Sequence, residues 1–349
     1  MSFHDFMAAA LYNPEHGYYA SGRAQIGRRG DFFTNVSVGS LFGRLLARQF
    51  AETWERLGSP ARWTILEEGA HCGQFAADAL EGLREFAPAC FEATCYVIVE
   101  PLPSLRAAQI CALYDLEVQW CESLAELEPF TGVHFSNELL DSFPVHLVAR
   151  THDGWVERHV TVRGESFVFT DGPLTDPRLA KHLASIDAPT GFVTEVNLRA
   201  LDWLSALAEK IEHGYVLLID YGYSREEYFE RFAGTLSAYA GHQREPDPLA
   251  RPGEIDLTAH VEFTSLIEHA MSAGLRLHGF TDQQRFMVGA SRLHFRGTVA
   301  APNELRAFKT LMHPDFLGAA FKVLCLERGS MASARLSGFQ SSRESHWPR

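Results

Sequence analysis

The stretch WTILEEGAHCGQ, residues 63–74, constrains the fold more than any other part of the sequence. It begins as an apolar strand over 63–67, passes through a turn bracketed by Gly69 and Gly73, and leads into an apolar-periodic helix over 75–86. A strand, a glycine turn and a helix in this order open a nucleotide-binding α/β unit, in which the helix N-terminus faces the ligand. We therefore expect a cofactor at this turn.

The spacing of this turn differs from both common phosphate-binding motifs. A phosphate loop places Lys and then Ser or Thr after its last glycine, whereas Gln74 and Phe75 follow Gly73 here. This difference excludes an ordinary phosphate-loop ATPase. A dinucleotide motif needs a third glycine and an acidic residue about twenty residues further on, but the corresponding acidic residue, Glu100, lies further downstream.

Glu100 closes a second predicted strand, over 95–100, and Pro101 and Pro103 interrupt the chain directly after it. An acidic residue at the carboxyl end of this strand is well placed to accept hydrogen bonds from two ribose hydroxyls. The pattern therefore predicts an adenosyl ligand that lacks a pyrophosphate. S-adenosylmethionine is the leading candidate.

The charge of the chain limits its partners. Among 349 residues, 31 are Lys or Arg and 44 are Asp or Glu, so the formal net charge is −13. Such a chain repels nucleic acid and anionic membrane surfaces and attracts cationic substrates. No apolar run approaches the length of a membrane span. We expect neither nucleic acid nor a membrane as a partner.

The cysteines and the first residues indicate the compartment. The six cysteines show no C-x-x-C spacing, and residues 1–20 contain Asp5 and Glu15 instead of a cationic leader followed by an apolar block. We therefore expect reduced thiols and a cytoplasmic location. The sixteen histidines include no pair at helix-face ligand spacing beside an acidic partner, so we expect no metal.

Polar residues follow two further predicted strands. The strand over 132–136 ends at Asn137 and Glu138, with Asp141 shortly after, and the strand over 215–220 ends in a carboxylate. In an open α/β sheet, the carboxyl ends of central strands border the ligand crevice. Asn137, Glu138 and Asp141 are therefore site candidates.

Strands and helices alternate along the chain, which predicts a mostly parallel sheet with helices on both faces. Two late strands, over 275–280 and 320–327, are typical of an antiparallel edge. A hairpin is expected around Asp153 and Gly154, and a helix is expected to open at Thr194 and Glu195.

We expect three parts in the chain. Residues 1–60 form a helical cap with a cofactor-covering loop, and residues 61–329 form the main domain, with insertions at about 146–200 and 234–260. The Ser- and Arg-rich residues 330–349 form a disordered tail.

Nine segments along residues 11–329 occur in an order that resembles one family. They are LYNPEHGYY, IGRRGDFFTN, LFGRLLA, ILEEGAHCGQFAADAL, VHFSNELLDSFPV, VLLIDYGY, GTLSAYAGH, PGEIDLTAHVEFT and TDQQRFM. Together they resemble the MidA-like S-adenosylmethionine-dependent methyltransferases, whose mitochondrial member acts on an arginine of a respiratory complex I subunit.

The resemblance implies a class I methyltransferase fold, Rossmann-like and seven-stranded, with an N-terminal helical cap and inserted segments. It implies that S-adenosyl-L-methionine lies at the glycine turn, with Glu100 on the ribose. Many methyltransferases carry another glycine inside this turn, where the present chain has His71. The cofactor-binding residues that we expect are Gly30, Asp31, Phe32, Glu67, Gly69, Ala70, His71, Gly73, Glu100, Asn137 and Glu138.

A guanidinium acceptor needs carboxylates that pair with its fork of N–H donors. The candidates for this catalytic role are Asp31, Glu138, Asp141 and Glu195. Three of them also have a structural alternative, because Asp31 can cap its turn and Asp141 and Glu195 can cap helices. The strand-end position of Glu138 favours a functional role.

Three functions remain open at this point. The first is a protein arginine N-methyltransferase, and the second is an O- or N-methyltransferase that acts on a small molecule. The third is a non-catalytic assembly or binding factor that retains the fold. A homodimer is compatible with all three.

Overall fold

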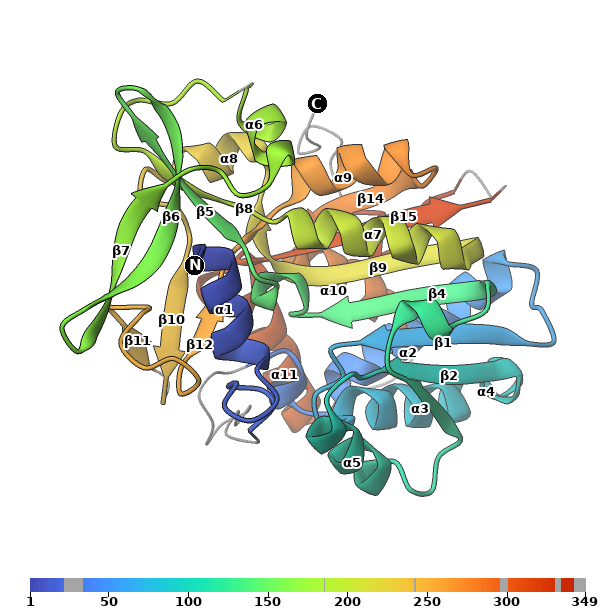
Figure 1. The fold of residues 1–349 in the computed structure, drawn as a ribbon. Helices are drawn as coiled ribbons and strands as arrows, with labels where there is room; N and C mark the ends of the chain where they lie inside the picture. Colours follow the sequence, from blue (N-terminus) through green and yellow to red (C-terminus); the bar gives the residue numbers. More distant parts are fainter. Residues whose placement is uncertain (22–33, 185, 242, 296–300, 330–333, 342–349) are drawn as a thin grey trace. The chain divides into compact units, whose positions relative to one another are not determined.

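The computed structural model describes residues 1–21, 34–184, 186–241, 243–295, 301–329 and 334–341 (Figure 1). The chain divides into two compact units. Unit 1 comprises residues 1–33, 140–203 and 223–263, and unit 2 comprises residues 34–139, 204–222 and 264–349. Each unit is described by itself.

Unit 2 is built on a sheet with the strand order β14-β15-β9-β4-β1-β2-β3. Neighbouring strands from β9 to β3 pair in parallel, and β15 runs antiparallel to both β9 and β14. The strands span β1 Trp63–Glu68, β2 Thr94–Val99, β3 Val118–Cys121, β4 Phe130–Asn137, β9 Ile211–Tyr223, β14 Arg276–Asp282 and β15 Phe321–Arg328.

The order of the strands fixes the location of the crevice. From β1 the chain continues to β2 and β3 on one side, whereas β4 and β9 extend the sheet on the other side. The register pairs Glu68 with Val99 of β2 and with Ser136 of β4, so these three strands end at the same edge. A reversal of strand order at β1 creates a crevice outside the carboxyl ends of β1 and β4. The expected Rossmann-like arrangement, a mostly parallel sheet with an antiparallel edge, is confirmed.

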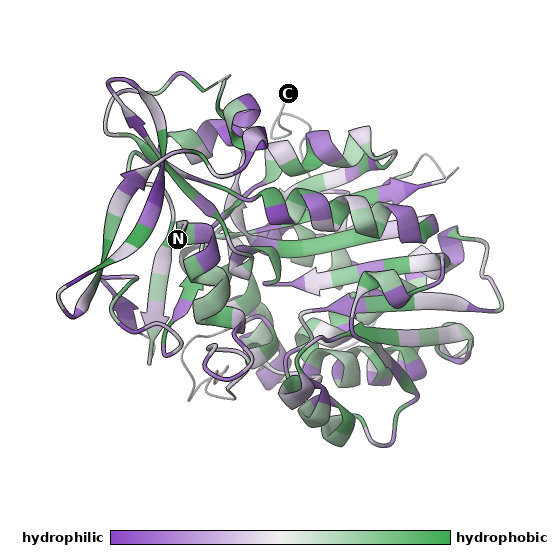
Figure 2. Ribbon diagram, viewed as in Figure 1, coloured by the Kyte–Doolittle hydropathy of each residue, from purple (hydrophilic) through white to green (hydrophobic). Residues whose placement is uncertain are grey.

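Helices accompany this sheet: α2 Leu41–Arg56, α3 Gln74–Phe86, α4 Pro88–Ala93, α5 Pro103–Ala112, α9 Phe263–Ser272, α10 Gln283–His294 and α11 Pro302–Met312, with short turns η1 Val36–Val38, η2 Leu124–Glu126 and η4 Pro314–Gly318. Two glycines let α2 and α3 approach closely. A Cβ on Gly43 would lie 2.5 Å from Cβ of Asp78, and one on Gly82 would lie 2.8 Å from Cβ of Ala47. Figure 2 shows a hydrophobic run in the middle of β9, and this part of the strand is buried.

The chain after β15 is partly anchored in unit 2, contrary to the disordered tail that we expected for residues 330–349. In the short turn η5 (Ser337–Phe339), Phe339 is fully buried and its ring centroid lies 5.3 Å from that of Phe286. The backbone N–H of Gly338 donates to Gln49 of α2 at 3.0 Å. The polar composition of the tail obscured these few anchoring residues.

Unit 1 contains two small sheets. One has the order β7-β6-β5-β8 and the other has the order β11-β10-β12, and all their pairings are antiparallel. Their strands are β5 His146–Thr151, β6 Gly154–Arg163, β7 Ser166–Gly172, β8 Val193–Val196, β10 Ser237–Ala240, β11 Gln243–Glu245 and β12 Asp256–Thr258; the short strand β13 is Val261–Glu262. The helices are α1 Phe3–Tyr12, α6 Pro177–Leu183 and α8 Arg225–Phe229, the turn η3 is Leu140–Ser142, and α7 (Leu198–Lys210) crosses the boundary between the units.

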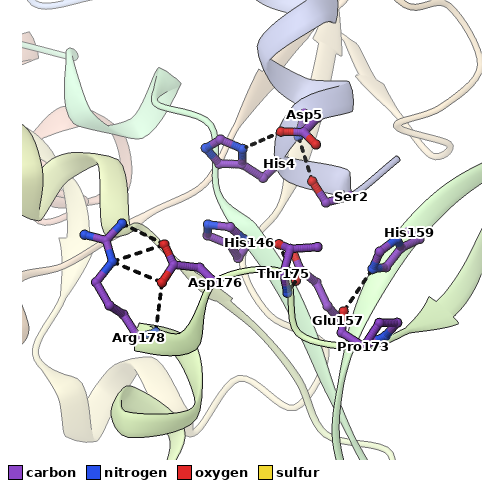
Figure 3. A network of polar contacts seen from close by, with 10 residues as sticks. All are labelled: Ser2, His4, Asp5, His146, Glu157, His159, Pro173, Thr175, Asp176 and Arg178. Carbon is purple, nitrogen blue, oxygen red and sulfur yellow. Dashed lines mark hydrogen bonds and ion pairs between the residues drawn. The ribbon is translucent and has the colours of Figure 1, made fainter.

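The two sheets of unit 1 share a core with α1. Phe3, Met7 and Leu11 of α1 are fully buried and pack with Leu147 and Leu257. At the start of α1 lies the polar network of Figure 3, in which the rings of His4 and His146 stack with centroids 4.5 Å apart.

The buried Glu157 is central to this network, because its carboxylate accepts from three donors. His146 Nδ1 lies 2.8 Å away, the Thr175 backbone N–H donates at 2.6 Å, and the Thr175 hydroxyl donates at 2.8 Å. Burial lowers the pKa of His146, although Glu157 opposes this effect. The network therefore holds a neutral imidazole against a carboxylate between α1, β5 and β6.

Two expectations about the chain are corrected. Residues 1–60 do not form one cap, because α1 belongs to unit 1 and α2 belongs to unit 2. Thr194 and Glu195 do not open a helix, because they lie in β8 and pair with Val148 and Leu147 of β5. The helix begins only at Leu198. The insertions expected at about 146–200 and 234–260 fall within the segments of unit 1.

No helix in the described part of the chain is long and apolar enough to cross a membrane.

Candidate functional site

The glycine turn after β1 adopts a backbone that few side chains tolerate. Gly69, His71 and Gly73 have φ angles of 79°, 47° and 83°, and the Gly73 N–H donates to the Ala70 carbonyl at 2.8 Å. His71 therefore takes the left-handed conformation that a glycine would adopt more easily, and such strain is found at ligand-binding sites. The backbone at this position thus keeps a glycine-like conformation, although the residue is a histidine.

The turn leads directly into α3. Gly73 is the N-cap residue of this helix and provides no side chain to its first N–H groups. These N–H groups and the helix dipole favour a negatively charged or polar ligand group. A Cβ on Gly69 would meet Leu139 at 3.5 Å and nothing closer, so the space beside this glycine is bounded by an apolar side chain.

Glu100 follows β2 and is 5% exposed. Its Oε1 accepts from the Leu102 N–H and its Oε2 accepts from Nε2 of Gln109, both at 2.9 Å. Burial raises the pKa of Glu100, and the two hydrogen bonds counteract this effect. The carboxylate is thus held in one orientation at the carboxyl end of β2, where a ribose would need an acceptor.

The two acidic residues that end β1 have different surroundings. Glu67 is buried and accepts from the Tyr96 hydroxyl of β2 at 2.7 Å, and burial raises its pKa to about 8. Glu68 lies 3.2 Å from Nε2 of the buried His134 in β4. Glu67 therefore braces β1 against β2, and this contact favours a supporting role over direct contact with a cofactor.

Glu138 has unusual backbone geometry at the carboxyl end of β4. Its φ angle is +57°, and its N–H donates to the Ile219 carbonyl of β9 at 2.9 Å. A non-glycine residue in this region costs roughly 1–3 kcal/mol, and such residues cluster at active sites. The observed strain therefore supports a functional position for this carboxylate.

A series of amide hydrogen bonds leads to Glu138. Gln283 Nε2 donates to Asn35 Oδ1 at 2.7 Å, Asn35 Nδ2 donates to Asn137 Oδ1 at 2.8 Å, and Asn137 Nδ2 donates to Glu138 Oε1 at 2.7 Å. Gln283 and Asn35 are fully buried. Sequence reasoning missed both residues, although each lies in a segment quoted above, GDFFTN and TDQQRFM.

Asp220 anchors the neighbouring strand end. It is 1% exposed, and its two oxygens accept from the backbone N–H groups of Leu139, at 3.2 Å, and Tyr221, at 2.8 Å. This carboxylate connects β9 to the residue that follows Glu138. It therefore helps to fix the backbone on which Glu138 lies.

Two predicted carboxylates belong to unit 1. Asp141 lies in η3 and is 6% exposed, and its backbone carbonyl accepts from the Ala259 N–H at 2.9 Å. Glu195 is also buried and accepts from the Tyr228 hydroxyl at 2.7 Å and from the N–H groups of Thr235 and Leu236, both at 2.9 Å. These contacts favour Glu195 as an anchor of the 234–236 loop.

The structure thus brings together in unit 2 the predicted residues Glu67, Gly69, Ala70, His71, Gly73, Glu100, Asn137 and Glu138. Gly30, Asp31 and Phe32 lie outside the described residues. Among the described residues, no group of three or more His, Cys, Asp and Glu side chains is arranged to hold a metal.

Comparison with known proteins agrees with this geometry. A family model described as S-adenosyl-L-methionine-dependent methyltransferase matches residues 45–281. A crystal structure from Burkholderia thailandensis, of a candidate methyl transferase bound to S-adenosyl-homocysteine, is similar with a TM-score of 0.89 and 33% identity. The similarity covers 99% of this chain and 92% of that chain.

Curated relatives are more distant in sequence. The mitochondrial protein arginine methyltransferase NDUFAF7 homolog of Drosophila melanogaster is 26% identical over 366 residues, covering 94% of this chain and 82% of the relative. Protein arginine methyltransferase NDUFAF7 of Homo sapiens, also mitochondrial, is 23% identical over 367 residues, covering 92% and 79%. The expected cytoplasmic location is wrong by this comparison, because these relatives are named as mitochondrial proteins.

Proposed function

From the premise that this chain belongs to the S-adenosyl-L-methionine-dependent methyltransferase family, we propose that the enzyme methylates an arginine side chain of a protein. The observation that carries the proposal is Glu138 at the carboxyl end of β4, whose backbone is strained and whose carboxylate is oriented by Asn137. The names of the curated relatives support the same acceptor. The net charge of −13 also favours a cationic substrate.

The residues at the turn fit S-adenosyl-L-methionine. Gly69 offers backbone without a side chain, α3 presents uncapped N–H groups after Gly73, and Glu100 offers an oriented carboxylate for the ribose. The cofactor, when bound, supplies an electrophilic methyl group on a sulfonium. The chain itself binds and orients, which is the main protein contribution to an in-line displacement.

Glu138 would hold the guanidinium. A carboxylate pairs with two parallel N–H donors of arginine, and this pairing fixes the plane of the acceptor as well as its distance. Asn137 restricts the rotation of the carboxylate through its 2.7 Å hydrogen bond. The negative charge also stabilises the cationic guanidinium while one nitrogen is presented for methylation. Asp31 and Asp141 remain predictions for this role.

The acceptor can be identified by methyl labelling. A cell lysate is incubated with the enzyme and with cofactor labelled in the methyl group, and protein and small-molecule fractions are then separated. Acid hydrolysis of the protein fraction should release labelled methylarginine. Label confined to small molecules would contradict the arginine proposal and would favour a metabolite acceptor.

The role of Glu138 is tested with Glu138→Gln. We expect turnover of the protein acceptor to fall roughly 100-fold, because the uncharged amide cannot pair with two guanidinium donors. Affinity for S-adenosyl-homocysteine, measured by calorimetry, should change much less. Glu117→Gln removes an exposed carboxylate from the same unit and is the matched control. Equal turnover in both variants would show that another group holds the acceptor.

A further inference from the structure

Gln109 of α5 is a fully buried polar side chain beside the cofactor turn, and no sequence motif pointed to it. Its Oε1 accepts from the indole Nε1–H of Trp120 in β3 at 3.0 Å. Because an indole N–H can only donate, this contact fixes which end of the amide faces β3. The amide nitrogen of Gln109 must therefore face the opposite direction.

That nitrogen connects two parts of the site. Nε2 of Gln109 donates to the His71 carbonyl at 2.8 Å and to Oε2 of Glu100 at 2.9 Å. An amide has two N–H donors, so each acceptor receives one. His71 belongs to the left-handed turn, and Glu100 directly follows β2. One side chain thus ties the turn to the carboxylate.

The packing of the glycine turn against α5 also brings Gln109 close to the turn. A Cβ on Gly73 would lie 3.0 Å from Leu113, directly after α5, and 3.6 Å from Cα of Gln109. The turn and α5 are therefore in close contact at the level of Gln109. The remaining oxygen of Glu100, Oε1, accepts from the Leu102 N–H just before α5.

We propose that Gln109 is a positioning residue that fixes the Glu100 carboxylate relative to the glycine turn, so that the nucleoside and amino-acid portions of the cofactor bind as one unit. This inference rests on the proposed function, in which Glu100 holds the ribose and the turn holds the methionine portion. No other common side chain of this size provides two donors and one acceptor without charge.

Glutamate at this position makes a sharp test. In Gln109→Glu the acceptor for Trp120 remains, but two carboxylates face each other where the donor was, and their repulsion raises the pKa of the pair. We expect the affinity for S-adenosyl-homocysteine to fall roughly 30-fold at about pH 8. The affinity should recover by about tenfold at about pH 6, because a shared proton replaces the lost donor.

Wild-type protein should show no such recovery, because protonation of Glu100 removes an acceptor from the ribose. Gln119→Glu makes the same chemical change at an exposed position of β3 and should bind like wild type at both pH values. Thermal unfolding of each variant shows whether the fold is retained. This pH dependence would not arise from a general loss of packing.

A neutral variant keeps the test valid if a buried carboxylate prevents folding. Gln109→Met retains the volume and should lose roughly tenfold in affinity for S-adenosyl-homocysteine at both pH values. It should lose less for methylthioadenosine, which lacks the amino-acid portion. Wild-type affinity of Gln109→Met for both ligands would overturn the proposal.

A further variant, Glu100→Gln, distinguishes failure of the proposed cofactor site from failure of the positioning role of Gln109. If it weakens binding of S-adenosyl-homocysteine while Gln109→Glu and Gln109→Met bind like wild type, the positioning role is wrong and the proposed cofactor site stands. If all three variants bind like wild type, the proposed site fails together with the positioning role.

Discussion

Replacement of Glu67 by Gln should make the protein more stable at alkaline pH. The carboxyl of Glu67 is buried and bonded to Tyr96, and burial raises its pKa from 4.5 to about 8. The unfolded chain therefore releases this proton several pH units before the folded protein does. As a result, wild-type stability should fall as the pH rises from 4.5 through 8.

The magnitude follows from the two pKa values. Each pH unit between them costs about 1.4 kcal/mol, so the interval from about pH 5.5 to about pH 8 changes the free energy of unfolding by roughly 3 kcal/mol. A glutamine does not titrate, and its amide oxygen can still accept from Tyr96. Between these two pH values, the free energy of unfolding of Glu67→Gln should therefore rise relative to that of wild type by the same amount.

Urea unfolding at both pH values measures this difference directly. Glu117→Gln, at an exposed position, should show a difference from wild type that is nearly independent of pH. If the difference for Glu67→Gln is also constant between the two pH values, the carboxyl is ionised in the folded protein and the reasoning is wrong. Retained affinity for S-adenosyl-homocysteine in this variant would agree with its supporting role in the sheet.

Further predictions concern both units. Gly69→Val should reduce the affinity for S-adenosyl-homocysteine by at least ~100-fold in calorimetry. It should also cost roughly 1–3 kcal/mol of stability, because valine disfavours a φ of 79°. Unchanged affinity would place the cofactor elsewhere. Because burial lowers the pKa of His146, wild-type stability should fall as the pH drops below about 6.5, and His146→Gln should reduce this slope in urea titrations; an identical slope would contradict the assignment. Phe339→Ala should cost roughly 3–5 kcal/mol in thermal or urea unfolding, whereas a cost near zero would show that the C-terminal turn does not contribute.

The strand, turn and helix at which we place the cofactor could be predicted from the sequence because their signals are local. A strand, the glycines of the turn and a helix follow one another within residues 63–86. The general rule for the carboxyl ends of parallel strands then places Glu100, Asn137 and Glu138 at one edge. Neither step requires knowledge of contacts between distant residues.

Other features depend on contacts between distant parts of the chain. Asn35 and Gln283 are 248 residues apart and meet only in the folded unit. Glu195 resembled a helix-capping residue, but its surroundings are set by the pairing of β8 with β5 and by the loop at Thr235. The left-handed backbone at His71 also has no clear local signal, because glycine is the residue that ordinarily indicates it.

The interleaved division of the chain restricts how this enzyme can be shortened. The backbone passes between the units five times, after residues 33, 139, 203, 222 and 263. Two of these passages, after residues 139 and 222, lie one residue beyond Glu138, which follows β4, and two residues beyond Asp220, which lies near the end of β9. Removal of unit 1 would therefore require the joining of chain ends beside Glu138 itself. Because Glu138 is the residue that we propose for the acceptor, any such joint would change the backbone beside the proposed acceptor site.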